Sequence, residues 1–423
     1  MAQLAVIGAG YVGLTSAACL AHLGHRVVCS DALAERVTGL RGGEIPIVEE
    51  GLADLVKEGL RSGRLSFTAS NAAAVAEAEF VLLCVPTPPA ADGRTDMSYI
   101  RAAAAEIGPH LRPESIVINK STVPVGSTRV VEQTLGRDDI SVVSNPEFLR
   151  EGSAVRDFLY PDRIVIGADD ESTAIKVSGM FLRTNAPLVV TDPASAEMIK
   201  YASNAFLATK LSFVNAMSAL CEAVGADIRQ VVLGMGFDRR IGSEFLRPGP
   251  GWGGSCLPKD VEALIHAADD VGYDFALLKG AVQANQEQYQ RMADKAVRLA
   301  GGSVDGRVVA VWGLTFKART DDLRHSPSLE IAARLTSAGA HVRGYDPTVR
   351  RPLPDIEICA DAYAACEGAS VIVVGTDWDE LRWLDFAKVV EEMALPSILD
   401  CRNLLEPAAM RRYGFTYEGV GLA

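Results

Sequence analysis

The chain has 423 residues, of which 48% are hydrophobic and 22% charged, and its net charge at pH 7 is −13. This length exceeds what a single hydrophobic core normally supports and predicts two or three domains. An acidic chain without a cluster of lysine and arginine excludes nucleic acid and anionic membranes as main partners. No apolar run reaches the ~18 residues of a membrane span, so we expect a cytoplasmic protein.

The first motif is the glycine triad Gly8, Gly10 and Gly13, which lies between a short apolar strand and a helical run. Glycines in this position allow a tight turn and bring a pyrophosphate to the N-terminus of the helix. The next apolar segment ends at Asp31, where a carboxylate would bind the adenosine ribose. The pattern therefore predicts NAD binding. Asp31 favours NAD over NADP, although Arg36 lies nearby.

Three further apolar segments, 80–85, 115–119 and 140–144, read as strands that each end in a polar or proline-containing loop. In a parallel sheet these loops lie at the carboxyl edge, so we expect them to face the cofactor and the substrate. The third loop carries Glu147 and Glu151, which are four apart and could share one face of a helix. Either could transfer a proton, but solvated carboxylates at the start of a helix would show the same spacing.

The segment from Ala194 to Val224 contains neither glycine nor proline, and its apolar residues repeat at helical spacing. This predicts one helix about 45 Å long, at ~1.5 Å per residue. Such a helix would connect domains and could pack against a second copy of itself. Lys200 and Asn204 lie one turn apart near its start and would stabilise an oxyanion if they faced an active site. A lysine there can also be an ordinary surface residue.

A glycine-rich loop at 249–254 precedes Ser255, Cys256 and a segment with helical spacing. With few side chains, its backbone N–H groups could approach a ligand closely. Ser255 or Cys256 could cap the helix, and a helix N-terminus favours the thiolate form of cysteine. Asp260 lies one turn later on the same face. The residues fit either a nucleophile with a candidate base or a capped helix with an inert, buried cysteine.

The eight cysteines are widely spaced, without a Cys-x-x-Cys pair or a cysteine–histidine cluster of metal-binding spacing. This indicates reduced, mostly buried thiols and no structural metal.

Helical patterns continue from Val261 to about Ala300, and a second α/β unit follows. Its expected elements are strands at 307–313, 341–345, 370–374 and 397–399 and a helix at 328–338. The segment Gly313-Leu-Thr-Phe-Lys317 stands where the first unit has its glycine triad. A lysine there predicts a different phosphate ligand, such as a nucleotide diphosphate.

Six segments together resemble the UDP-glucose/GDP-mannose dehydrogenase family: Gly8-Ala-Gly-Tyr-Val-Gly13, Val85-Pro-Thr-Pro, Asn145-Pro-Glu-Phe-Leu, Lys200 with Asn204, Gly253-Gly-Ser-Cys256-Leu-Pro-Lys-Asp260 and Gly313-Leu-Thr-Phe-Lys317. The resemblance covers essentially the whole chain. It implies an α/β fold in which a central helical domain with a long connecting helix joins two Rossmann-like, doubly wound domains, and it implies a homodimer. The expected limits are 1–195 for the NAD-binding domain, 196–300 for the helical dimerisation domain and 301–423 for the sugar-nucleotide domain.

The family resemblance also implies an activity, the two-step oxidation of the C6 alcohol of a nucleotide sugar to a carboxylate with two NAD per turnover. The implied catalytic roles are a nucleophile at Cys256, an oxyanion-stabilising pair at Lys200 and Asn204, a group assisting the thiol and water at Asp260, a proton-transfer group at Glu147 and a water-ordering residue at Thr122.

The implied binding residues fall into two sets. Cofactor contacts are expected at Gly8, Ala9, Gly10, Tyr11, Val12, Gly13, Asp31, Arg36, Val85, Thr87, Ser121, Thr122, Glu151 and Arg324. Substrate contacts are expected at Glu147, Phe148, Leu149, Glu151, Lys200, Asn204, Phe245, Arg247, Gly249, Gly251, Trp252, Gly253, Phe316, Lys317 and Arg402, with Arg240 reaching the site of a neighbouring subunit.

UDP-glucose is the expected substrate, and GDP-mannose, TDP-glucose and N-acetylated UDP-sugars are the alternatives within the family. Two more distant alternatives are a two-electron β-hydroxyacid dehydrogenase and a non-catalytic NAD-binding scaffold. The second α/β unit and Cys256 argue against the first, and the full set of catalytic residue types argues against the second.

Overall fold

The computed structural model describes residues 1–90 and 92–422, and the chain divides into two compact units. Unit 1 consists of residues 1–203 and 262–270, and unit 2 consists of residues 204–261 and 271–423. Two helices, α9 (Pro193–Val224) and α11 (Leu257–Asp270), contribute residues to both units. The limits of the three expected domains stay a prediction, and residue 423 lies outside the described part.

Unit 1 contains an eight-stranded sheet. Its strands, in spatial order, are β3 (Leu65–Thr68), β2 (Arg26–Ser30), β1 (Gln3–Ile7), β4 (Phe80–Leu83), β5 (Ile116–Asn119), β6 (Ser141–Ser144), β7 (Ile164–Gly167) and β8 (Leu188–Thr191). Neighbouring strands are parallel, except that β7 runs antiparallel to β6 where Ser144 meets Gly167. The strand order reverses between β1 and β4, which is the point where open α/β sheets bind ligands.

Side chains alternate between the two faces of this sheet, as the period of a strand requires. Leu4 and Val6 of β1 belong to one core, with α1 (Tyr11–His22), α2 (Ala34–Arg41), α3 (Leu52–Arg61), α7 (Ala154–Leu159) and α8 (Glu171–Ser178). Ala5 and Ile7 belong to the other, with α4 (Asn71–Val75), α5 (Ser98–Ile107) and α6 (Ser127–Leu135). Both faces are therefore covered. Two 3₁₀ turns, Gly108–His110 and Gly179–Thr184, complete unit 1.

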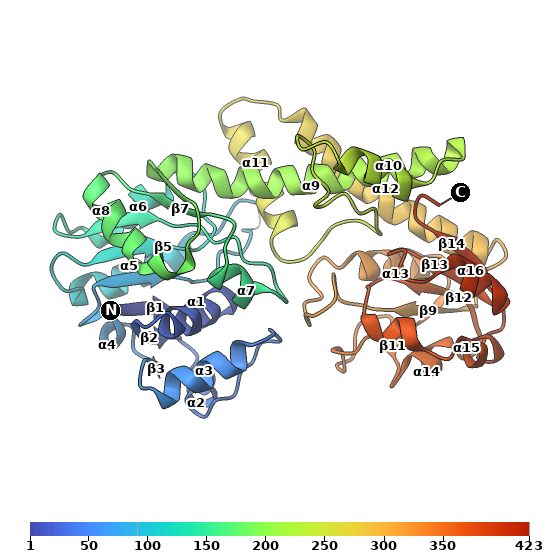
Figure 1. The fold of residues 1–423 in the computed structure, drawn as a ribbon, viewed down its shortest axis with the longest axis horizontal. Helices are drawn as coiled ribbons and strands as arrows, with labels where there is room; N and C mark the ends of the chain where they lie inside the picture. Colours follow the sequence, from blue (N-terminus) through green and yellow to red (C-terminus); the bar gives the residue numbers. More distant parts are fainter. Residues whose placement is uncertain (91, 423) are drawn as a thin grey trace. The chain divides into compact units, whose positions relative to one another are not determined.

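Unit 2 contains a six-stranded parallel sheet. Its strands, in spatial order, are β11 (Ile356–Ile358), β10 (His341–Tyr345), β9 (Val308–Trp312), β12 (Ala369–Val374), β13 (Ser397–Asp400) and β14 (Thr416–Gly419). One face packs against α12 (Ala276–Leu299) and α13 (Pro327–Ser337). The other packs against α14 (Ala362–Cys366), α15 (Phe386–Glu392) and α16 (Pro407–Arg412), as Figure 1 shows for α12 on one side and α14 and α15 on the other. A 3₁₀ turn covers Asp379–Trp383.

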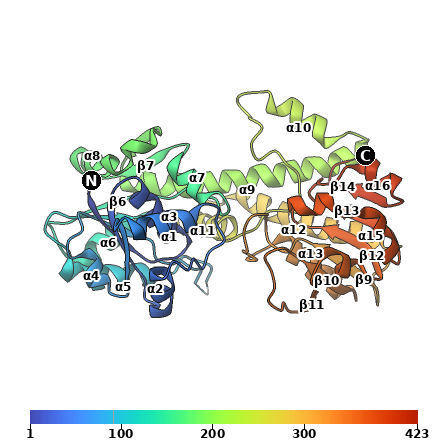
Figure 2. The same ribbon diagram turned by 60° about the horizontal axis from the view of Figure 1, so that its bottom comes forward.

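The long helix expected from residue 194 onward is present as α9, which has 32 residues and runs unbroken in Figure 2. A shorter helix, α10 (Ile228–Gly236), follows it. The expected α/β fold, with two Rossmann-like sheets and a central helical region, is confirmed. Within residues 1–90 and 92–422, none of the helices combines the length and apolar character needed to cross a bilayer.

Candidate active site

The glycine triad forms a tightly packed turn between β1 and α1. A Cβ atom at Gly13 would lie 1.8 Å from the Gly8 carbonyl oxygen, and one at Gly8, where φ is +100°, would lie 2.6 Å from the Cys84 carbonyl oxygen. Gly10 is different, because a Cβ there would meet nothing within 4 Å. Two of the glycines are thus required by the packing of the turn, and the third leaves open space at the start of α1. An open helix N-terminus suits a pyrophosphate, so these residues fit a dinucleotide.

Asp31, immediately after β2, stabilises this turn through hydrogen bonds. Its carboxylate accepts hydrogen bonds from the backbone N–H of Ala9 and of Leu33, both at 2.9 Å, and Arg36 pairs with it at 3.0 Å. The predicted ribose-binding carboxylate therefore lies beside the glycine triad, as the motif requires.

Tyr11 is engaged in a contact that the sequence does not predict. Its hydroxyl donates to Glu49, and both oxygen atoms, the Tyr11 hydroxyl at 2.9 Å and the Glu49 carboxylate at 2.7 Å, accept from the backbone N–H of Gly152. Burial and the neighbouring Glu49 raise the pKa of the Tyr11 hydroxyl far above its usual value. Glu49 thus connects the glycine-rich turn to the loop that carries Glu151. No motif marks Glu49, one of two adjacent glutamates in a loop.

The loops that follow β4, β5 and β6 meet one another, as expected for neighbouring parallel strands. Ser121 donates its hydroxyl to the Val85 carbonyl oxygen at 2.8 Å. The buried Lys120 donates to the Asn145 side chain at 3.1 Å, and Asn145 in turn donates to the Val165 carbonyl oxygen at 2.7 Å. The predicted cofactor residues of these loops lie at one edge of the unit 1 sheet.

Glu147 and Lys200 form a buried ion pair within unit 1. The Lys200 ammonium lies 2.9 Å from the Glu147 carboxylate, and each side chain is only 5% exposed. The Phe148 ring lies beside them, with its centroid 5.4 Å from the Lys200 ammonium and 3.6 Å from the Arg163 guanidinium. Burial opposes ionisation of Glu147, but Lys200, the Leu149 N–H and Lys120 together outweigh it and lower the pKa of the carboxyl below its usual value. Glu147 is therefore held as a carboxylate.

The prediction that Glu147 and Glu151 share one face of a helix is wrong. Residues 145–150 form no helix, and α7 begins only at Ala154. Pro146 disfavours helical geometry at the residue before it, and the Glu147 carboxylate accepts the Leu149 N–H at 2.6 Å, which stabilises a local turn.

Asn204 and Asp260 meet within unit 2. The Asn204 side-chain amide donates to the Asp260 carboxylate at 2.5 Å, and Lys259 pairs with the other carboxylate oxygen at 2.7 Å. Asp260 is completely buried, and its backbone N–H bonds to the Cys256 carbonyl oxygen at 2.9 Å. This bond closes the first turn of α11 and brings the predicted base one turn from the predicted nucleophile.

Cys256 differs from the other cysteines. None of the eight, each within the described residues, forms a disulfide; seven are buried, and Cys256 is partly exposed. It immediately precedes Leu257, the first residue of α11, as the helix-capping pattern predicts. The Ser255 hydroxyl lies 3.4 Å from its sulfur. The alternative interpretation of Cys256 as an inert, fully buried residue therefore does not fit this position.

The glycine-rich loop before Cys256 is held mainly by the protein itself. The N–H groups of Gly249 and Trp252 donate to the side chains of Asn215 and Asn285, both at 2.8 Å, and that of Gly254 donates to a backbone oxygen at 3.0 Å. These three N–H groups are therefore used inside unit 2. The sequence could not show this, because the partners are distant in the chain. Contact of the remaining loop backbone with a ligand stays a prediction.

The predicted sugar-nucleotide residues of the C-terminal sheet lie beside that loop. Arg402 donates to the carbonyl oxygens of Phe316 and Gly375, both at 2.8 Å, and a Cβ at Gly249 would lie 3.5 Å from its guanidinium. The Phe316 ring packs against Gly254, and the Lys317 ammonium lies 5.3 Å from the centre of that ring. Arg402, Phe316 and Lys317 therefore gather around residues 249–254.

Each predicted residue can now be placed in one unit. Unit 1 holds Gly8, Ala9, Gly10, Tyr11, Val12, Gly13, Asp31, Arg36, Val85, Thr87, Ser121, Thr122, Glu147, Phe148, Leu149, Glu151 and Lys200. Unit 2 holds Asn204, Arg240, Phe245, Arg247, Gly249, Gly251, Trp252, Gly253, Cys256, Asp260, Phe316, Lys317, Arg324 and Arg402. Among residues 1–90 and 92–422, no group of three or more His, Cys, Asp or Glu side chains is arranged to hold a metal ion.

Comparison with known families assigns all three parts of the chain. Residues 2–184 match the NAD-binding domain of the UDP-glucose/GDP-mannose dehydrogenase family, residues 194–287 its central domain and residues 310–407 its UDP-binding domain. The chain belongs to this family. The family resemblance and the predicted cofactor, NAD, are confirmed, and the chain is an NAD-dependent nucleotide-sugar dehydrogenase.

Individual family members align along almost the full chain. A UDP-glucose 6-dehydrogenase of Pseudomonas aeruginosa is 44% identical over 99% of this chain and 97% of its own, and the UDP-glucose 6-dehydrogenase TuaD of Bacillus subtilis is 42% identical over 100% and 93%. The solved structure of a UDP-glucose dehydrogenase from the archaeon Pyrobaculum islandicum is 38% identical over 100% of this chain and 98% of its own, with a TM-score of 0.90.

Proposed function

We propose that this enzyme oxidises the C6 alcohol of UDP-glucose to the carboxylate of UDP-glucuronate, with two NAD per turnover. The relatives named above as UDP-glucose 6-dehydrogenases support the substrate. The single observation that carries the mechanism is the environment of Cys256, a partly exposed thiol at the N-terminus of α11 with the buried Asp260 one turn away.

Cys256 is assigned the role of nucleophile because a four-electron oxidation passes through an aldehyde that must not escape. Its thiolate adds to the C6 aldehyde, the carbon–sulfur bond forms, and the carbonyl oxygen becomes an alkoxide. Loss of a hydride from this thiohemiacetal leaves a thioester, and water then displaces the thiol to release the acid. NAD, when bound, accepts the hydride in each of the two oxidations.

Lys200 and Asn204 are assigned the role of stabilising the negative oxygen. They lie one turn apart on α9 and are donors whose orientation is fixed by carboxylates, Lys200 by Glu147 and Asn204 by Asp260. Fixed donors stabilise developing charge more than mobile ones, and the loss of one such donor costs roughly 100-fold or more in rate. Glu147, held ionised, is the assigned proton acceptor, and Thr122 the assigned water-ordering residue.

The test replaces the thiol and counts electrons. Wild-type enzyme is expected to form two NADH and one uronate per UDP-glucose, whereas Cys256→Ala should form no uronate and lose at least about three orders of magnitude in rate. Cys359→Ala, which removes a buried thiol, is the matched control and should retain both products. Calorimetry should show unchanged NAD binding in both variants. Full uronate formation by Cys256→Ala would refute the nucleophile.

The substrate assignment has its own test. A panel of UDP-glucose, GDP-mannose, TDP-glucose and an N-acetylated UDP-sugar is assayed for NADH formation, and UDP-glucose should give the highest kcat/KM. A larger kcat/KM with another sugar would transfer the assignment to that alternative. One NADH per substrate, in place of two, would favour the two-electron dehydrogenase.

A homodimer is proposed from the exposed face of α9. Phe206, Phe213 and Leu220 follow one another at intervals of seven residues and are 67%, 50% and 53% exposed. An apolar stripe of this kind on a long helix is typical of an interhelical contact. The Arg240 side chain, 89% exposed, is the residue proposed to reach the partner's site. A cytoplasmic location stays a prediction.

A further inference from the structure

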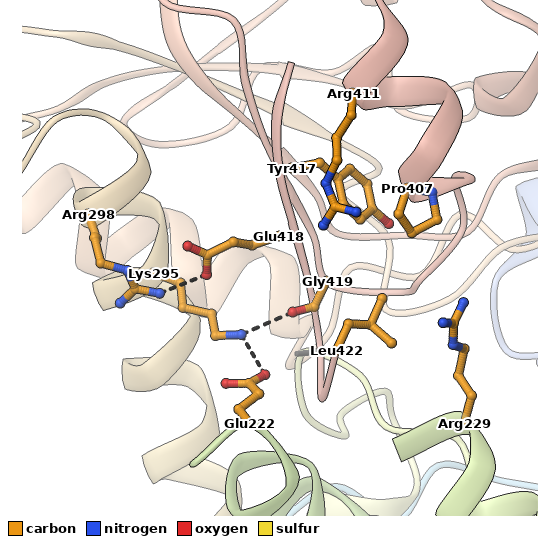
Figure 3. A pocket seen from close by; sticks show the side chains of 10 residues that line it. All are labelled: Glu222, Arg229, Lys295, Arg298, Pro407, Arg411, Tyr417, Glu418, Gly419 and Leu422. Atoms are coloured by element: carbon orange, nitrogen blue, oxygen red, sulfur yellow. Dashed lines mark hydrogen bonds and ion pairs between the residues drawn. The ribbon is translucent and has the colours of Figure 1, made fainter. Parts of the chain in front are cut away.

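A cavity of about 370 Å³ lies in unit 2, and none of the predicted site residues lines it. Residues of α9, α10, α12 and α16, of β14 and of the C-terminal segment surround it, as the close view in Figure 3 shows. Its volume falls within the ~300–1,000 Å³ typical of small-molecule sites.

The walls of the cavity are cationic, although the chain as a whole carries a net charge of −13. Arg229, Lys295, Arg298 and Arg411 line it together with two carboxylates, Glu222 and Glu418. With Asp227, which pairs with Arg229 from just outside the lining, four positive and three negative side chains leave a formal excess of one positive charge. Although the chain as a whole is acidic, this cavity therefore attracts anions.

Both carboxylates are already used in ion pairs within the wall. Glu222 pairs with the buried Lys295 at 2.6 Å, and Lys295 also donates to the Gly419 carbonyl oxygen at 3.0 Å. Glu418 pairs with Arg298 at 2.7 Å. These pairs, drawn as dashed lines in Figure 3, neutralise one side of the cavity. Because Arg229 pairs with Asp227, Arg411 is the source of the excess charge.

Arg229 and Arg411 enter the cavity from different elements. Arg229 projects from α10 and pairs with Asp227, two residues earlier, at 2.6 Å, and Arg411 projects from the last turn of α16. Among the described residues, no ion pair or hydrogen bond involves the Arg411 guanidinium. Figure 3 draws Leu422 and Tyr417 with the two arginines among the residues that line the cavity.

We propose that this cavity binds a small organic molecule that carries a phosphate group. A guanidinium offers two parallel N–H donors that match phosphate oxygens, and one with its donors still available binds a phosphate most strongly. The apolar side chains of Leu422 and Pro407 and the Tyr417 ring supply a surface for the organic part of the ligand. This proposed binding site is distinct from the predicted catalytic site, because no predicted catalytic residue lines the cavity.

The experiment titrates the full chain with ribose 5-phosphate and, separately, with inorganic phosphate, at constant ionic strength and in the presence of saturating NAD and UDP. NAD and UDP occupy the proposed cofactor and substrate sites, so that added phosphate reports on other sites. Isothermal calorimetry should show saturable binding of ribose 5-phosphate to the wild-type chain, tighter than that of inorganic phosphate.

Arg411→Ala is compared with Arg412→Ala, which removes the neighbouring exposed arginine of α16 that does not line the cavity. Arg411→Ala and, independently, Arg229→Ala should weaken binding of ribose 5-phosphate by at least about tenfold, or ~1.4 kcal/mol, and Arg412→Ala should not. All three variants should keep the dehydrogenase rate, which reports correct folding. The absence of saturable binding to wild type, or equal affinities of Arg411→Ala and Arg412→Ala, would overturn the proposal. Equal affinities for both phosphates would overturn the organic class of the ligand.

Discussion

At the scale of single residues, the decisive feature is how carboxylates are used. Glu147 holds Lys200, Asp260 holds Asn204, and Glu49 holds Tyr11, so that each positions a side chain predicted to act in binding or catalysis. All three are buried, where a hydrogen bond to an ionised group is strong and its loss is costly. Substitution of these carboxylates should therefore alter both stability and activity.

The Glu147–Lys200 pair gives a direct prediction of stability. Glu147→Gln keeps the shape of the side chain but removes its charge, so it should lower the free energy of unfolding by on the order of 3 kcal/mol. Glu50→Gln, at an exposed position nearby in sequence, is the control and should change it little. Urea unfolding at neutral pH measures both. A Glu147→Gln variant as stable as the control would show that the pair contributes no net stability.

The same pair predicts a pH dependence. Because the pKa of folded Glu147 is lowered, the pair stabilises the fold fully above the unfolded glutamate pKa of about 4.3, and this contribution is lost as the pH falls through the folded value. We expect the stability difference between wild type and Glu147→Gln to shrink as the pH drops below about 4. Urea unfolding over a pH series checks this. A difference that grows on acidification would contradict the assigned direction.

At the scale of elements, the loop before α11 shows how glycines serve packing. A Cβ at Gly253 would lie 1.8 Å from the His325 carbonyl oxygen, and one at Gly251, where φ is +130°, would lie 2.3 Å from the Tyr289 ring. Backbone atoms cannot move aside as a flexible side chain can. The glycines therefore let this loop pack against its own unit, and this packing fixes the position of the chain immediately before Cys256.

Two glycine substitutions test this interpretation. Gly253→Ala should displace the loop, lower the free energy of unfolding by about 2 kcal/mol and reduce the dehydrogenase rate. Gly234→Ala, at an exposed position in the last turn of α10 where a Cβ meets nothing within 4 Å, should instead stabilise the protein by up to ~1 kcal/mol and keep the rate. Urea unfolding and initial rates of NADH formation measure both. If the two variants behaved alike, the packing role of Gly253 would be excluded.

The two sheets use equivalent carboxylates in a related way. Asp31 follows β2 and accepts the Ala9 N–H, and Asp346 follows β10 and accepts the N–H groups of Leu314 and Thr315. Asp346 also accepts from Thr315, Thr348 and Trp378 side chains and is completely buried. In the second sheet this carboxylate is thus fully used as a brace, which is consistent with a ligand other than a dinucleotide there.

At the scale of the whole molecule, the chain consists of two compact units that each contain a doubly wound sheet, and α9 supplies residues to both. The exposed apolar residues of α9 predict that two copies of the chain pack against each other along this helix. A charge placed in an apolar contact is buried in both copies and is strongly unfavourable. The proposed dimer is therefore expected to be sensitive to single substitutions on this helix.

Phe213→Glu should raise the dissociation constant of the dimer by at least about tenfold, or ~1.4 kcal/mol. Ile175→Glu, at a similarly exposed position on α8, is the control and should leave the dimer intact. Sedimentation equilibrium over a range of concentrations distinguishes the two. A wild-type chain that is monomeric, or a Phe213→Glu variant that remains as dimeric as Ile175→Glu, would exclude this face of α9 as the contact.

The sequence alone determined the elements whose signal is local. The strands at 26–30 and 341–345 have the predicted bounds, α9 begins one residue before the predicted range, and α11 starts immediately after Cys256. Apolar periodicity and the residues that start or end an element depend on neighbours within a few positions, and these can be read directly. The motif spacings, through the resemblance to a family, identified the nucleotide-sugar dehydrogenase.

The tertiary structure decided the features that depend on distant residues. It showed that Glu147 lies in an irregular turn and not on a helix, that Glu49 holds Tyr11, that β7 runs antiparallel to β6, and that Asn215 and Asn285 take up N–H groups of the glycine-rich loop. Apart from the local bond between Leu149 and Glu147, each of these contacts joins residues whose separation in the chain carries no local pattern. Which buried polar groups become partners is set by packing of the complete chain, because a buried donor or acceptor must find its partner wherever the fold brings one.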